Sequence, residues 1–157
     1  MEFMDIRKGN DVEFGQSIYE PFGIAQLESL TFGGICVFSS ICGCAGFVRD
    51  VTAPESVKNI IIADYTNLDT RDYADIEDLL QIDRSVREQI EVGQSEKVAK
   101  EIVWRLAKNE SEIENMIQTG YALAKNMSWD VAVKNHLLGS LQKALDKQRS
   151  QRIYTKT

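Results

Sequence analysis

The sequence predicts an α/β protein built on an open parallel sheet, and three observations indicate it. Apolar runs of strand length occur at Ile35 to Phe38 and at Asn59 to Ala63, and both are continuous rather than alternating. Continuous runs are typical of parallel strands that are covered on both faces. Helical segments separate these strands, which gives the alternation of an open α/β sheet, whose ligands bind outside the carboxyl ends of the strands.

The amino-terminal elements follow from periodicity and from turn residues. A short strand is predicted within residues 11–18, where apolar and polar residues alternate. A helix is predicted from about Pro21 to Phe32, because proline has a φ angle suited to the first helical position and Gly33-Gly34 supplies a stop signal. This helix is expected to bury Ile24, Leu27 and Leu30.

The rest of the chain is predicted to be an acidic insertion followed by helices. The insertion covers residues 66–95 and includes a short helix over 76–82. Its acidic residues lack the glycine and spacing of an EF-hand loop, so we expect a solvated surface. Helices are then predicted over 96–108, 111–126 and 129–147, the last capped by Ser128. The chain is thus expected to be one partial domain, residues 1–157, divided into a core (10–65), the insertion (66–95), carboxyl-terminal helices (96–148) and a tail (149–157).

Composition limits the classes of function. The chain has 157 residues, enough for one domain with a core, and a net charge of -6 from 18 basic and 24 acidic residues. This charge disfavours a nucleic acid as partner, because phosphate backbones need a basic face. Neither a membrane-spanning apolar run nor a signal-peptide pattern occurs, so a cytoplasmic protein without a membrane span is expected.

The three cysteines do not form a predicted metal site. Cys36, Cys42 and Cys44 stand beside a single histidine, His136, and this set lacks the four patterned ligands that zinc needs. We therefore expect no metal and interpret the cysteines as small buried apolar residues. Cys42 or Cys44, in the turn after a predicted strand, is alternatively a partly exposed and reactive thiol.

The segment Tyr19-Glu20-Pro21-Phe22-Gly23 carries the strongest functional signal. A glycine in the first turn lets a ligand approach the backbone, and the free N–H groups of that turn favour a phosphate. Glu28 is expected roughly 8 to 10 Å further along the helix axis, where it would accept hydrogen bonds from a sugar hydroxyl. Glu20 would lie at the mouth of this site. The alternative is that both glutamates belong to a solvated helix surface.

The spacing Glu-x7-Glu in this setting resembles the signature of retaining, nucleotide-sugar-dependent glycosyltransferases of the GT-B fold, with the glycogen and starch synthases as the nearest relatives. The resemblance continues through Phe32 to Ser40, and Gly43 matches a glycine of the family's Gly-Gly turn. Ser128-Trp129 is similar to the pair that opens the family's closing helices. Gly46 stands where relatives often carry an acid, which is a departure from the pattern.

The resemblance implies a role for each residue of the motif. Glu20 would be the catalytic residue that lies beside the donor sugar, helps to position it and stabilises charge developing at its anomeric carbon. Phe22 and Gly23 would contact the sugar, and the amides of Ile24 and Ala25 the distal phosphate. Glu28 would hold the ribose. The donor, ADP-glucose or UDP-glucose, is a substrate, and no cofactor is implied.

The resemblance also implies a Rossmann-like, partial carboxyl-terminal GT-B domain. The amino-terminal domain with the acceptor site is then a missing partner, and the isolated chain is expected not to transfer sugar. A truncated parallel sheet would expose an edge, through which the chain could self-associate. The alternative is a non-catalytic interaction module derived from this fold, with the acidic residues 69–78 and the long helices as its binding surface.

Overall fold

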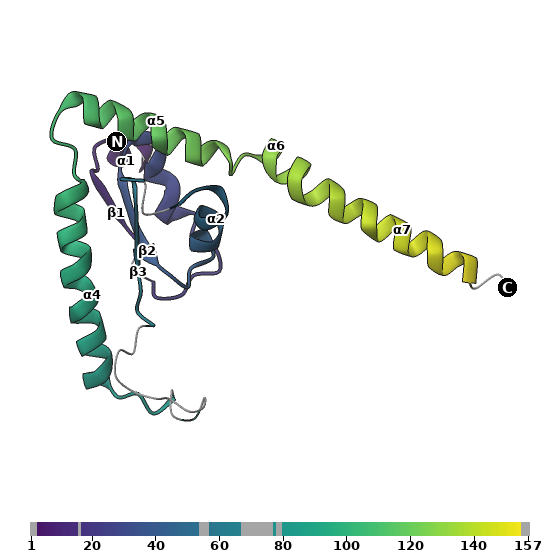
Figure 1. Cartoon of the computed structure of the whole chain (residues 1–157), viewed down its shortest axis with the longest axis horizontal. Coiled ribbons are helices and arrows are strands. Elements are labelled where there is room, and N and C mark those ends of the chain that lie inside the picture. The colour runs from purple at the N-terminus through teal and green to yellow at the C-terminus, as the bar shows by residue number, and fades with distance from the viewer. Residues whose placement is uncertain (1–2, 16, 54–56, 67–76, 78–79, 155–157) are drawn as a thin grey trace.

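The computed structural model describes residues 3–15, 17–53, 57–66, 77 and 80–154. Within these ranges the protein is α/β, with a parallel three-stranded sheet in the order β1-β2-β3 (Figure 1). The strands are β1 (Val12–Phe14), β2 (Ile35–Ser39) and β3 (Ile60–Ala63). All three carboxyl ends therefore meet at one edge of the sheet, where a ligand of an open α/β sheet binds.

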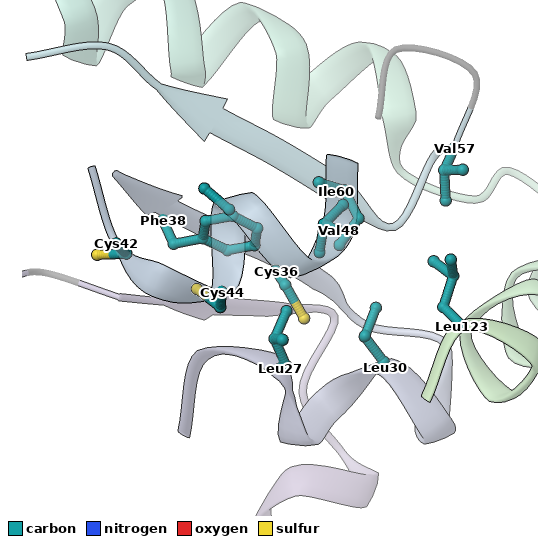
Figure 2. Close-up of a cluster of buried hydrophobic side chains, with 11 residues drawn as sticks. Leu27, Leu30, Cys36, Phe38, Cys42, Cys44, Val48, Val57, Ile60 and Leu123 are labelled. Atoms are coloured by element: carbon teal, nitrogen blue, oxygen red, sulfur yellow. The ribbon is translucent and has the colours of Figure 1, made fainter. Parts of the chain in front are cut away.

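The central strand is covered on both faces, as the sequence predicts. Every residue of β2 is buried. Cys36 and Phe38 belong to one core cluster, together with Leu27 and Leu30 of the preceding helical segment (Figure 2). Ile35 and Val37 belong to a second cluster on the opposite face. Successive side chains of a strand point to opposite faces, so a continuous apolar run fills both cores.

The helix predicted over Pro21 to Phe32 begins later and is tighter. The structure has a 3₁₀ helix, η1 (Ala25–Phe32), whose cap residue Ile24 is exposed rather than buried. Leu27 and Leu30 are buried as expected, and Gly33 ends the helix with a φ of 83°. A short helix precedes the first strand, α1 (Phe3–Lys8), which the sequence analysis did not predict.

The later helices are present with different limits. They are α2 (Gly43–Val51), α4 (Arg84–Arg105), α5 (Glu110–Lys125), α6 (Trp129–Ala132), the π-helical η3 (Val133–Leu137) and α7 (Leu138–Tyr154). The start predicted at residue 96 is wrong, because α4 begins inside the expected acidic insertion. Of the helix predicted over 76–82, residues 76, 78 and 79 lie outside the described residues, Glu77 and Leu80 are helical, and the helix does not continue through Gln81 and Ile82. Within the described part of the chain, no helix is long and apolar enough to cross a membrane.

The helices are placed unequally around the sheet. Helix α4 covers one face, with Val98 packed in the cluster around Val37, and α5 packs along η1 through Leu123. Helix α7 extends away from the sheet and ends far from it (Figure 1). The residues that surround the motif therefore come from the amino-terminal two thirds of the chain.

Candidate functional site

The motif segment crosses the start of α2 at the carboxyl edge of the sheet. The amide of Gly43 donates to the carbonyl oxygen of Glu20 at 3.1 Å, and the amide of Cys44 donates to that of Phe22 at 2.8 Å. The first turn of a helix has N–H groups without a partner inside the helix. Two of these groups in α2 are satisfied by the motif backbone, which fixes residues 20–22 against this helix.

This docking depends on the absence of a side chain at residue 43. A Cβ atom on Gly43 would collide with the carbonyl oxygen of Pro21 and lie 3.0 Å from the Cα of Phe22. Backbone atoms cannot swing aside as the end of a flexible side chain can. The glycine that matches the resemblance is therefore required by a close approach between α2 and the motif.

The expected first-turn amides are displaced along the chain. Because η1 begins at Ala25, Pro21 and Phe22 are not helical, and the helix start predicted at Pro21 is wrong. The amides of Ile24 and Ala25 lie at the actual start of the helix and donate no hydrogen bond within the described part of the chain. Both residues are exposed. These are the two amides that the resemblance assigns to a phosphate.

The space beside Gly23 is filled by the protein itself. Gly23 has a φ of 83°, which favours glycine, and a Cβ atom there would collide with the side chain of Gln26. A Cβ atom on Gly15 would meet the same side chain. Gln26 is buried, and its Oε1 has no hydrogen-bond partner among the described residues. The expected open approach to the Gly23 backbone is therefore occupied by Gln26.

The second glutamate of the motif is paired with a buried arginine. Arg7 of α1 forms an ion pair with the Oε2 atom of Glu28 and donates to the carbonyl oxygen of Ala25 at 3.2 Å. It also lies 3.8 Å from the Oε1 atom of Glu13. The Glu28 side chain keeps 39% of its surface exposed. Glu28 is thus neither free in solvent nor closed off from a ligand.

The other motif residues lie nearer to α2. Glu20 is half-buried, and its charge contributes, after burial and the neighbouring Cys42, to raising the pKa of Cys44 to about 11. The ring of Phe22 packs at 6.3 Å from that of Phe47, and remains partly exposed. The structure therefore brings Glu20 and Phe22 together at the start of α2, and places Ala25 and Glu28 together beside Arg7.

A polar cluster that the sequence analysis missed follows β2 and β3. The Ser40 hydroxyl donates to the Oδ1 atom of Asp64 at 3.2 Å, and Thr66 donates to the same atom through its hydroxyl and its amide. These hydrogen bonds lower the pKa of Asp64, and those from Thr66 have the largest effect. Polar residues placed directly after two adjacent buried strands were the signal available in the sequence.

The cysteines are free and buried. The alternative of a partly exposed thiol is wrong, because Cys42 and Cys44 are 3% and 0% exposed. Burial raises the pKa of Cys36 to about 12, against a smaller opposing effect of its hydrogen bond with Ser29. Such thiols carry little thiolate, the reactive form. Among the described residues, no three His, Cys, Asp or Glu side chains group as metal ligands would.

A cavity of about 610 Å³ opens at the same edge of the sheet. Its wall joins Ile18, which precedes the motif, to Tyr65 and Thr66, which follow β3. The rest of the wall comes from the start of α4 and the residues before it: Leu80, Ile82, Arg87, Ile90 and Glu91. Among the described residues, the cavity wall is mostly apolar with one basic and one acidic side chain. The size of the cavity falls in the range of small-molecule sites.

Comparison with protein-family models, with curated proteins and with solved structures finds no match to this chain.

Proposed function

We propose that this chain is the donor-binding part of a retaining glycosyltransferase, most similar to glycogen and starch synthases that use ADP-glucose or UDP-glucose. The observation that carries the proposal is the position of the Glu-x7-Glu segment. It lies where an open α/β sheet binds its ligands, with the backbone of Glu20 and Phe22 fixed on α2 and with Glu28 held beside Ala25. The three-stranded sheet would be a piece of a Rossmann-like domain.

Each residue of the motif has a chemical task in this proposal. The exposed amides of Ile24 and Ala25 bind the distal phosphate, because free N–H groups at a helix start attract anions. Glu28 accepts hydrogen bonds from the ribose hydroxyls. Phe22 and Gly23 contact the sugar, which requires the Gln26 side chain to leave the space beside Gly23.

Glu20 acts on the reacting centre. When the bond between sugar and phosphate breaks, positive charge develops at the anomeric carbon, and a carboxylate placed beside it lowers the barrier. Among the described residues, the Glu20 carboxylate makes no hydrogen bond or ion pair, whereas its backbone carbonyl holds α2. Its side chain is therefore available for this task. The acceptor site would be supplied by a further domain, so the chain alone is expected to bind the donor without transferring sugar.

Nucleotide binding tests the proposal. Saturation-transfer NMR with ADP, UDP and GDP detects weak binding and reports which ligand protons lie against the protein. The expected result is binding of one nucleotide with strong transfer to its ribose protons, reduced in the Glu28→Gln variant. Glu114→Gln, an exposed change on α5, is the matched control. Absence of transfer to all three nucleotides would overturn the proposal.

An interaction module is the second candidate, and the exposed leucines of the last helices favour it. Four leucines in this part of the chain each have about half of their surface exposed: Leu137, Leu138, Leu141 and Leu145. Leu138, Leu141 and Leu145 are spaced by three and four residues, which places their side chains on one side of α7. A chain that binds no nucleotide but retains this apolar stripe would match the second candidate.

A further inference from the structure

Arg7 is a charged side chain in an unusual position. It lies on α1 and is only 4% exposed, although arginine is almost never fully buried unless it is paired. Its partners include the Glu28 carboxylate, the Ala25 carbonyl and, at 3.8 Å, the Glu13 carboxylate. The guanidinium therefore joins the helix α1, the strand β1 and both of the η1 residues that the proposed function assigns to a nucleotide.

The charges in this group leave Glu28 able to accept further hydrogen bonds. One guanidinium with two carboxylates gives a net charge of -1. Arg7 contacts the Oε2 atom of Glu28, and the partly exposed side chain keeps acceptor positions toward solvent. A planar guanidinium fixes the orientation of a carboxylate better than a point charge does.

We propose that Arg7 is a positioning residue for ribose recognition: it holds the Glu28 carboxylate in the orientation that accepts the ribose hydroxyls, and ties it to Ala25 beside the phosphate. This inference rests on the proposed function, because the ribose is the ligand group concerned. Arg7 itself is not expected to touch a ligand, since it is buried and its partner Glu28 is the partly exposed member of the pair. Its effect is therefore expected on discrimination between ligands with and without ribose hydroxyls.

The experiment compares two ligands on each variant. Affinities are measured by NMR titration for the nucleoside diphosphate that binds, ADP or UDP, and for its 2′,3′-dideoxy form. Hydrogen bonds to a charged group predict that the wild-type protein prefers the ribose form by roughly 10- to 100-fold. In Arg7→Met this ratio is expected to fall to about threefold or less. Arg7→Lys should give an intermediate ratio, because lysine keeps the positive charge but lacks the planar guanidinium that orients a carboxylate.

The controls separate positioning from general stability. Lys8→Met changes an exposed basic residue of the same helix and should leave the ratio at its wild-type value. If Arg7→Met does not fold, the intermediate ratio of Arg7→Lys carries the test. Equal weakening of both ligands, with an unchanged ratio in the folded variants, would overturn the inference while the proposed function stands. Failure of the wild-type protein to bind any nucleotide would overturn both.

Discussion

Removal of the Glu28 carboxylate should destabilise the fold, because it leaves Arg7 buried without its nearest partner. Breaking a buried ion pair at one side costs about 3–5 kcal/mol. The Glu13 carboxylate, at 3.8 Å from Arg7, still compensates part of the charge of this arginine. We therefore expect Glu28→Ala to lower the free energy of unfolding by about 3 kcal/mol, the lower end of this range. The Glu28→Gln variant keeps a carbonyl acceptor for the guanidinium and should lose less.

A double-mutant cycle measures this coupling directly. Urea unfolding followed by circular dichroism gives the free energy of unfolding for Glu28→Met, for Arg7→Met and for the double variant. Replacing both members of a buried pair by apolar groups is often close to neutral, so the double variant should be more stable than the sum of the single changes predicts. A loss below about 1 kcal/mol in Glu28→Met, or strict additivity, would refute this account of the pair.

Further predictions concern α2, the buried thiol and the strand-end cluster. Gly43→Ala should cost roughly 1–3 kcal/mol of unfolding free energy, because its Cβ would collide with the motif backbone. Gly46→Ala, in the same helix with open space around it, should stabilise by about 0.5–1 kcal/mol, and urea unfolding of both variants compares them. Because burial raises the pKa of Cys36 from 9.0 to about 12, the folded state holds that proton more tightly, so stability should fall as the pH rises above 9.0. Urea midpoints at neutral pH and at pH about 10 should differ less in Cys36→Ala than in the wild-type protein. Thr66→Val should raise the pKa of Asp64 toward 3.8 in an NMR titration, and should reduce the stability that Asp64 contributes above that pH and loses in acid.

The sheet could be predicted from the sequence because short runs of consecutive residues indicate its strands. The apolar run at residues 35–38 is continuous, and the strand found there is buried on both faces. The start of η1 could not be predicted in the same way. Pro21 is compatible with a first helical turn, but the carbonyls of Glu20 and Phe22 bond instead to amides of α2, which comes later in the chain. A tertiary contact therefore decided a local conformation.

The hydrophobic pattern of the sequence could not predict which basic residues are buried. Arg7 stands in a polar stretch, and its burial results from α1 folding back onto η1. Arg105 is likewise buried at the end of α4, where it donates to the carbonyl oxygens of Val57 and Ile60 at 2.6 and 2.7 Å. Hydrophobic patterns indicate exposure for both, because they do not register partners that are distant in sequence.

The two glutamates of the motif contribute to the fold through different groups. A side-chain substitution can therefore test ligand binding without removing a stabilising contact at Glu20, but not at Glu28. Glu20 fixes α2 through its backbone carbonyl, so its carboxylate is free to be changed without breaking that contact. Glu28 serves both purposes through the same carboxylate, which compensates a buried cation and faces solvent. A loss of nucleotide binding in Glu28→Ala would therefore mix two effects, whereas Glu28→Gln keeps an acceptor for Arg7 and changes mainly the charge offered to a ribose.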